Sequence, residues 1–388
     1  MQRHEPKQAV EAWRRYVSMG AIDAEKLAPT IARAWERCHE ARANPLRMRA
    51  EMLSRYDTER TRAKNATLIS AASPYVHALS RAAGPERHAV MLGDPRAIVL
   101  DVMGDHASVY GPESVPGPGA LLSEACAGAN GIATPLAERS YVQLTGAEHF
   151  IGGFHAFTCQ GVPIAGSSSE SVGCLSASVR SPATAARLRH ILGMAAKGIA
   201  AELRAVSLRE SVAAITGAGK PEDKALLLAR LYQEVVQAHV DGRFHVELSS
   251  FELGSMGDAS QLLIDAEAAI DRFDRLSRAW RLVADADPSG ARDVPTRELL
   301  DDLIALLQPE AKLHQATLRG DTAAAPGRGL GPPGTARALV YETESCLRQA
   351  GAGGSVELYA SEGGCLTWTV ASKAGRVSRA TAFLAGSC

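Results

Sequence analysis

Three side chains able to ligate a metal ion lie close together near the middle of the chain. They are His149, His155 and Cys159, with five and then three residues between them. Zinc sites use imidazole and thiolate ligands at helical or knuckle spacings, and this spacing is of neither kind. We therefore expect no metal here. His149 is predicted to have a structural or pocket-lining role, and Cys159, on a predicted strand, to be a small buried residue rather than a reactive thiol.

Aromatic side chains surround these groups in the sequence. Phe150, Phe154 and Phe157 are three of only seven phenylalanines in the chain. One interpretation is an apolar ligand pocket and the other is an ordinary domain core. Both stay open, because ligand pockets are themselves carved from domain cores. Phe150 and Phe154 flank Gly152-Gly153, a flexible turn that would let the two rings fold down as a lid.

Two polar residues upstream complete the candidate site. Glu124 and Asn130 follow a Pro/Gly-rich loop at 111–120, and loops on rigid sheets commonly hold ligands. Asn130 also has a structural interpretation, a turn conformation within Gly-Ala-Asn-Gly. An imidazole and a carboxamide would give a small polar ligand its directional hydrogen bonds. The predicted ligand-binding residues are Glu124, Asn130, His149, Phe150, Phe154 and Cys159.

No residues form a recognisable catalytic set. The spacing supports no nucleophile with its base, and the sequence contains no Gly-x-x-x-x-Gly-Lys phosphate loop. His245 would need exposure and a competent ATPase domain to accept a phosphate, so a solvated histidine on a helix is the favoured interpretation. Asp241-Gly242 nearby is predicted to break or shift that helix. We expect no catalysis and no cofactor.

The elements that position these residues follow from hydrophobic periodicity. The predicted fold class is α+β: N-terminal helices, an antiparallel sheet with helices, a long helix, a helical hairpin and a small C-terminal α/β unit. Two early helices surround Trp13 and Trp35. Further helices are predicted at 58–79 (stopping near Pro74 or restarting after it), 182–215, 222–250, 258–286, 299–307 and 335–349. Strands are predicted at 89–105 (two, joined by a Gly-Asp-Pro turn), 141–144, 158–164, 173–179, 355–360 and 365–370.

The predicted helices carry extensive apolar surface. A seam at steps of three and four runs along the long helix, formed by Leu188, Leu192, Ala195, Ile199, Leu203 and Val206. The second hairpin helix carries another on one side, formed by Leu263, Ile270, Phe273, Trp280 and Val283. A lone hairpin would leave much of this surface exposed. We therefore predict homodimerisation through the helices at 182–215 and 222–286.

Composition excludes several classes of protein. Lys+Arg 42 against Asp+Glu 43 leaves a net charge of -1, which argues against a nucleic-acid-binding surface, so no direct DNA binding is expected. The start of the chain lacks an apolar signal segment, and the uncharged stretch at 149–169 contains too many polar residues, glycines and prolines to span a membrane. Seven scattered cysteines without a CxxC pair argue against a disulfide scaffold. We expect a cytoplasmic protein.

Several short motifs lie in a fixed order between residues 119 and 180. They are Glu124, GANGIAT at 128–134, VQL at 142–144, GAEHF at 146–150, Cys159, Pro163-Ile164 and GCL at 173–175, with AWERC at 34–38 upstream. Their order resembles the GAF sensor domain of acetoin-operon-type enhancer-binding activators over about residues 30–180. Ala129 and Ala133 depart from that family's Thr and Gly. The resemblance implies a GAF fold in which the loop at His149 lies over the sensor sheet.

The C-terminal part resembles a histidine kinase transmitter in the order of its elements. The helical hairpin is followed by VPTRELL at 294–300, a helix and GGSVEL at 353–358. Cys346 and Ser372 stand near the family's magnesium-holding Asn and adenine-contacting Asp, and no Gly-rich ATP lid precedes the end at Cys388. A kinase needs Mg²⁺ and donors around the phosphates. The resemblance therefore implies a degenerate transmitter, a pseudokinase retained for dimerisation and partner contact.

These observations predict a cytoplasmic sensory and regulatory protein. The predicted domains are an N-terminal helical region (1–80), a GAF sensor with its signalling helix (81–215), a dimerisation hairpin (222–290) and a truncated ATPase-like domain (291–388). A small molecule bound by the GAF domain would bias the long helix. The resemblances imply a response regulator or transcription factor as partner. The alternatives are an active histidine kinase with unusual motifs and a structural dimer whose GAF domain binds nothing.

Overall fold

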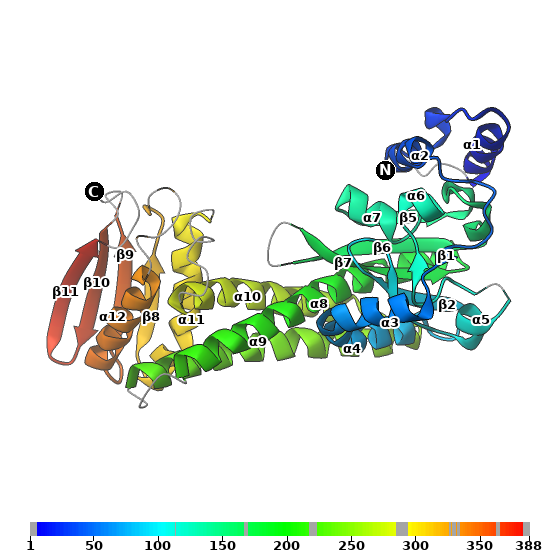
Figure 1. Cartoon of the computed structure of the whole chain (residues 1–388). Helices are drawn as coiled ribbons and strands as arrows, with labels where there is room; N and C mark the ends of the chain where they lie inside the picture. The colour runs from blue at the N-terminus through cyan, green and yellow to red at the C-terminus, as the bar shows by residue number, and fades with distance from the viewer. Residues whose placement is uncertain are drawn as a thin grey trace. The chain divides into compact units, whose positions relative to one another are not determined.

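The computed structural model describes residues 6–112, 114–166, 170–216, 223–284, 294–325, 327, 331, 334–361 and 365–382. The architecture is mixed α+β, as the sequence predicts (Figure 1). The chain divides into two compact units. Unit 1 comprises residues 1–203 and 242–267, and unit 2 comprises residues 204–241 and 268–388.

Unit 1 is built on a five-stranded antiparallel sheet in the order β3-β2-β7-β6-β5. The strands are β2 (His88–Gly93), β3 (Val99–Gly104), β5 (Val142–Thr145), β6 (Thr158–Ala165) and β7 (Ser171–Val179). The β2–β3 hairpin turns at Asp94, whose buried carboxylate accepts hydrogen bonds from the backbone N–H groups of Arg96 and Ile98. This confirms the hairpin predicted from the Gly-Asp-Pro turn.

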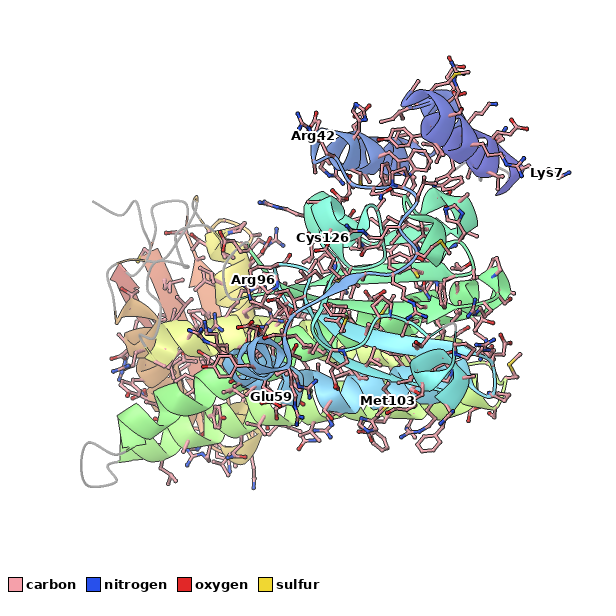
Figure 2. The ribbon with its side chains drawn as sticks, turned by 45° about the vertical axis from the view of Figure 1, so that its right-hand side comes forward. Lys7, Arg42, Glu59, Arg96, Met103 and Cys126 are labelled. Carbon is pink, nitrogen blue, oxygen red and sulfur yellow. The ribbon has the colours of Figure 1, made fainter. Side chains whose placement is uncertain are left out.

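The N-terminal helices α1 (Pro6–Met19) and α2 (Pro29–Glu40), joined through the short 3-10 helix η1 (Ala24–Lys26), pack onto the rest of unit 1. Lys7 lies on α1 and Arg42 follows α2, and both helices lie over the part of unit 1 that carries Cys126 (Figure 2). The region predicted at 1–80 thus shares a hydrophobic core with the sheet. That core includes Ala12, Tyr16, Ile31, Ala34, Trp35 and Cys38 from the helices, and Ala89, Met91, Leu144 and Cys174 from the strands.

The helix predicted at 58–79 is two helices, α3 (Arg55–Lys64) and α4 (Ala66–Ala83). The break falls at Asn65, whose side-chain amide donates to the carbonyl oxygen of Thr61 and so satisfies the end of α3. Pro74 lies inside α4 and does not end it. The shorter elements between α4 and the site are α5 (His106–Tyr110), β1 (Glu51–Met52) paired with β4 (Ala120–Leu121), α6 (Glu124–Ala127), α7 (Ala133–Glu138), η2 (Gly146–Glu148) and η3 (Gly152–Phe154).

The long helix α8 (Pro182–Thr216) follows β7 directly. Gly198 allows α8 to approach α4 closely, because a side chain at this position would meet the ring of Tyr75 at 2.3 Å. The first part of the predicted seam, from Leu188 through Ile199, is buried. Leu203 is half-buried and Val206 is exposed, so the seam does not continue to Val206 as predicted.

The predicted helical hairpin is present as α9 (Asp223–Gly254) and α10 (Ser260–Ala284). Asp241-Gly242 does not break α9, contrary to the prediction. The Asp241 carboxylate accepts a hydrogen bond from the Gln237 side chain one turn earlier, and Gly242 is buried, so both residues fit a continuous helix.

Unit 2 contains a four-stranded sheet in the order β11-β10-β9-β8, in which β8 and β9 are parallel and the other pairs antiparallel. Its elements include α11 (Thr296–Leu313), β8 (Thr317–Asp321), α12 (Thr335–Ala350), β9 (Ser355–Ala360), β10 (Cys365–Ser372) and β11 (Gly375–Ala382). The buried Trp368 of β10 donates its indole N–H to the hydroxyl of Thr343 on α12 at 2.9 Å. This bond fixes α12 on the sheet.

The apolar side of α10 is covered within the chain. The ring of Phe273 lies 5.1 Å from that of His239, and the ring of Trp280 lies 6.1 Å from that of Tyr232, both on α9. Ile270 is likewise buried. These side chains are therefore unavailable to a second copy of the chain, contrary to their predicted role in a dimer interface.

Candidate functional site

Glu124, the first residue of α6, is held by an arginine from α2. Arg37 donates from Nε to Glu124 Oε2 at 2.6 Å and from Nη2 to Glu124 Oε1 at 2.9 Å. Its Nη1 donates to Glu138 Oε1 of α7 at 2.7 Å. The hydrogen bond to Glu124 raises the pKa of Arg37, and the bonds from Arg33 and Arg37 lower the pKa of Glu138. Such bidentate, charge-assisted pairs are strong, and this one engages both oxygens of Glu124.

Asn130 has a hydrogen-bonding role within its own loop. Its Nδ2 donates to the carbonyl oxygens of Leu122 (2.6 Å) and Gly128 (2.7 Å). Its Oδ1 accepts from the backbone N–H groups of Ile132 (2.9 Å) and Ala133 (3.0 Å). The carboxamide thus makes four hydrogen bonds and holds the turn. A ligand could bond to it only by replacing one of them.

His149 is fully buried beside η2. Its Nδ1 lies 2.9 Å from the carbonyl oxygen of Gly146, and its ring packs against that of Phe154 in a T-shaped arrangement. Burial lowers the pKa of His149 to about 4, so the ring is neutral at physiological pH. Nε2 has no hydrogen-bond partner among the residues that the structure describes. Within the same residues, no three His, Cys, Asp or Glu side chains are grouped so that they could hold a metal ion.

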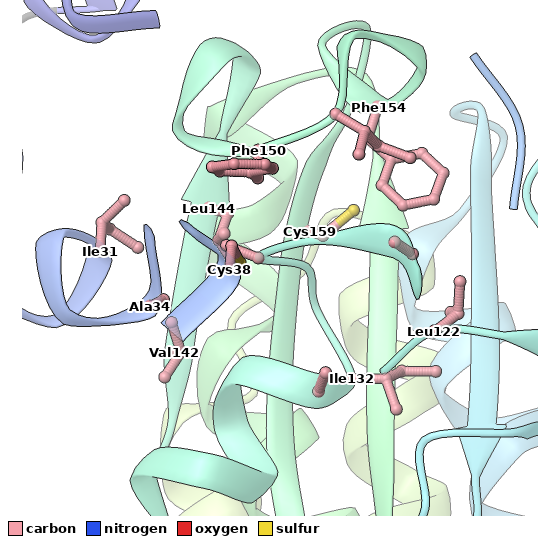
Figure 3. Close-up of a cluster of buried hydrophobic side chains, with 14 of the residues drawn as sticks. Ile31, Ala34, Cys38, Leu122, Ile132, Val142, Leu144, Phe150, Phe154 and Cys159 are labelled. Carbon is pink, nitrogen blue, oxygen red and sulfur yellow. The ribbon is translucent and has the colours of Figure 1, made fainter. Parts of the chain in front are cut away.

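The two phenylalanines predicted as a lid occupy different places (Figure 3). Phe150 is buried in the core between the N-terminal helices and the sheet. Its ring centroid lies 5.0 Å from that of Tyr16 and 5.6 Å from that of Trp35. Phe154 instead borders two cavities near Cys159. Phe150 is therefore a packing residue, whereas Phe154 lines both spaces.

The inner cavity lies over strands β6 and β7 and has a volume of about 20 Å³. It is lined by Met91, Val115, Pro116, Leu122, Asn130, Gly131, Ile132, Phe154, Phe157, Cys159 and Ser178. Cys159 and Ser178 are opposed across the two strands, with Sγ and Oγ 3.1 Å apart. Burial raises the pKa of Cys159 to about 12, so its thiol is uncharged. The described lining contains no charged side chain.

A larger outer groove of about 680 Å³ adjoins the inner cavity. Its walls are formed by Met48, Arg49, Ala50, Met52, Gly111, Pro112, Ser114, Val115, Pro116, Gly117, Gly152, Gly153, Phe154, Ala156 and Phe157. Val115, Pro116, Phe154 and Phe157 line both spaces. We call these four shared side chains the partition, because the groove and the cavity meet at them.

Sequence reasoning missed Ser178 and the role of Arg37. A signal for Ser178 was present, since serines alternate with apolar residues along β7 and residues two apart share a face of a strand. Gly131 shows how tightly the loop sits on this face: a Cβ there would lie 2.7 Å from Ser176 Oγ and 2.8 Å from Cys159 Cβ. The partner of Arg37 lies 87 residues away in the chain, which no local pattern indicates.

No helix in the described ranges is long and apolar enough to cross a bilayer.

Comparisons with known proteins concern mainly unit 1. Residues 5–202 match the family described as MimR, N-terminal domain. The acetoin dehydrogenase operon transcriptional activator AcoR of Bacillus subtilis (strain 168) is 28% identical over 188 residues, 48% of this chain and 31% of its own length. The propane 2-monooxygenase operon transcriptional activator MimR of Mycolicibacterium goodii is 27% identical over 158 residues, which are 40% of this chain and 26% of that protein's length. The chain thus spans about a third or less of these relatives.

A solved structure, the E. coli DhaR(N)-DhaL complex, is similar with a TM-score of 0.42 at 16% identity, covering 45% of this chain and 61% of that chain.

His149 leads us to expect a pH-dependent stability. Its pKa is about 4 in the folded chain and 6.5 in the reference state, so protonation favours the unfolded chain. The contribution of the neutral His149 to the free energy of unfolding is about 3 kcal/mol. It is fully present above about pH 6.5 and is lost as the pH falls toward 4. Urea unfolding between pH 7.5 and 4.5 should show a weaker pH dependence for His149→Gln than for the native chain. His106→Gln, at an exposed histidine, should keep the native dependence, and equal slopes for all three chains would contradict the expectation.

Proposed function

The chain belongs to the MimR N-terminal domain family over residues 5–202, and on this premise we propose that it is a signal-sensing regulatory protein. The matched relatives are transcriptional activators, which supports a regulatory role. In this proposal unit 1 is the sensor and binds a small molecule. The observation that carries the proposal is the inner cavity, separated from an open groove by two phenylalanine rings.

The chemistry of the cavity favours a small, uncharged ligand. A volume of about 20 Å³ is space for one or two water molecules, so a ligand of few heavy atoms enters only if Phe154 and Phe157 move. The described walls offer the hydroxyl of Ser178 but no countercharge, and burying an unpaired charge is costly. The operons named for the relatives concern acetoin and propane, which are small and uncharged.

The cavity floor connects directly to the long helix. Ser178 lies near the end of β7, and α8 begins at Pro182. On the neighbouring strand, Gln160 follows Cys159 and donates its side-chain amide to the carbonyl oxygen of Ala185 in the first turn of α8 at 3.0 Å. A ligand that shifts β6 against β7 would therefore alter the start of α8. This is the physical route by which occupancy would bias the helix, provided the ligand prefers one arrangement.

The rest of the proposal concerns partners. A transcription factor or response regulator in the cytoplasm would read the state of the sensor, without catalysis by this chain. In unit 2, Cys346 is buried in α12 and Ser372 ends β10, and neither side chain supplies the carboxamide or carboxylate that a kinase uses for Mg²⁺ and adenine. His245 is half-buried on α9.

Homodimerisation remains part of the proposal, with a different surface. On α9 within unit 1, Phe244 and Phe251 are 56% and 58% exposed. They are seven residues apart, two turns of a helix, so they lie on one face. The guanidinium of Arg81 covers one side of the Phe251 ring at 4.2 Å. Exposed aromatic side chains on one helix face are typical of an interface.

Ligand binding is expected to depend on Ser178. We expect acetoin to raise the melting temperature of the full chain, and lactate, in which a carboxylate replaces the acetyl group, to leave it unchanged. Ser178→Ala removes a buried hydrogen bond and should weaken acetoin binding roughly 5- to 150-fold. Ser255→Ala, at an exposed serine after α9, is the matched control. Equal affinity of all three chains, measured by calorimetry, would place the ligand elsewhere.

The absence of kinase chemistry is tested with Mg-ATP. Calorimetric titration of the full chain should give no binding heat, and incubation with radiolabelled ATP should label no histidine. Micromolar binding together with labelling of His245 would support the alternative, an active histidine kinase.

The dimer surface is tested by light scattering. The native chain should have the mass of a dimer, and Phe244→Glu with Phe251→Glu should give a folded monomer. Tyr110→Glu, at an exposed aromatic residue on α5, should remain a dimer. A dimer mass for the double variant would move the interface away from α9.

A further inference from the structure

The N-terminal helices hold the loop that carries Phe150 and Phe154. The indole N–H of Trp35 on α2 donates to the carbonyl oxygen of Glu148 at 2.9 Å, and that of Trp13 on α1 donates to the carbonyl oxygen of Phe150 at 2.8 Å. Residues 146–157 contribute Phe154 and Phe157 to the partition between groove and cavity. The position of the partition is thus tied to helices that lie far away in the sequence.

A second connection reaches the opposite wall of the cavity. Glu124 and Glu138 lie on either side of the loop at 128–132, and Arg37 bonds to both. Thr134 donates its hydroxyl to Glu124 at 3.0 Å and accepts the backbone N–H of Asn130 at 3.1 Å. A continuous chain of hydrogen bonds therefore runs from α2 to Asn130, which lines the cavity.

We propose that Arg37 is a positioning residue of the sensor site: by bridging Glu124 and Glu138 it fixes the loop at 128–132 and keeps the inner cavity closed. The guanidinium suits this role because its planar donors reach two carboxylates at once, whereas a lysine ammonium is a single point charge. The proposal rests on the proposed function, since it concerns access to the same cavity. It adds that the N-terminal helices take part in positioning the ligand-binding site.

The protein contains its own reporters of cavity opening. The thiols of Cys159 and Cys174 are buried beneath the loop, with Cys159 lining the cavity and Cys174 Sγ 3.8 Å from the carbonyl oxygen of Gly131. When the loop lifts, both thiols become accessible to a small alkylating reagent. Cys346, buried in unit 2, reports on events unrelated to the site.

The experiment measures alkylation of each thiol in the full chain by iodoacetamide at one pH, followed by peptide mass spectrometry. Arg37→Ala should speed alkylation of Cys159 and Cys174 about tenfold or more, because charged hydrogen bonds contribute more than the 1.4 kcal/mol that a factor of ten represents. The rate at Cys346 should stay at the native value. Arg37→Lys should give an intermediate rate, since lysine restores part of the bridge.

Two matched arginine variants separate positioning from general stability. Arg33→Ala removes an ion pair with Glu138 but no contact to Glu124, and it should leave Cys159 near the native rate. Arg187→Ala removes hydrogen bonds to the carbonyl oxygens of Ala82, Ala83 and Leu253. It should lower the melting temperature of the chain without opening the cavity.

The outcomes are decisive in both directions. The proposal is overturned if Arg37→Ala leaves Cys159 at the native rate, or if Arg187→Ala speeds it equally. Because iodoacetamide serves as the probe, the result does not depend on acetoin. Fast alkylation of Cys159 in Arg37→Ala, without acetoin binding by the native chain, would support the positioning role of Arg37 and reject acetoin as the ligand. Acetoin binding with unchanged alkylation would support the sensor function and reject the positioning role of Arg37.

Discussion

The ion pair of Arg37 with Glu124 and Glu138 organises unit 1. It joins α2 to two short helices, α6 and α7, that flank the loop at 128–132 in the cavity wall. Trp35 of the same helix α2 packs with Tyr16 and Phe150 in an aromatic cluster. The aromatic contacts supply buried apolar area, which is the main favourable term in such packing. The ion pair supplies direction, because a bidentate guanidinium accepts only a narrow range of geometries. Together they fix where the loops can lie.

The sheet determines what the cavity can accept. Small side chains, Cys159, Ser176 and Ser178, occupy the face of β6 and β7 beneath the loop, so the loop with Gly131 approaches the strands closely. Little space remains, and the groups that face it are neutral. Cys159, which lines the cavity, is held uncharged because burial raises the pKa of its thiol. The cavity therefore offers little volume and, in its described walls, no charged side chain.

Unit 2 follows different physical rules. Its core is formed by helix packing and by a sheet fixed through Trp368 and Thr343, and its buried carboxylates are paired with arginines, as Glu310 is with Arg230. Its contribution to the proposal is the surface that a partner would read.

The sequence by itself determined most of the elements and their order. Period-two and helical apolar patterns located the strands β5, β6, β7, β9 and β10, the helices α2 and α8 and the α9–α10 hairpin, and the Gly-Asp-Pro turn located the β2–β3 hairpin, because these signals are local. The strands β1, β4, β8 and β11 were not predicted. The motifs between residues 119 and 180 also indicated the sensor family. Boundaries set by single side chains, such as the break at Asn65, were beyond those patterns.

Only the tertiary structure decided what each polar residue does. Glu124 pairs with Arg37, and Asn130 stabilises its own turn. Phe150 lies in the core, and Ser178 lies beside Cys159 at the cavity. The same holds for α10, whose apolar side is covered by the chain itself. The physical reason is that a side chain's role depends on the groups that contact it after long-range packing. Spacing in the sequence carries no information about those contacts.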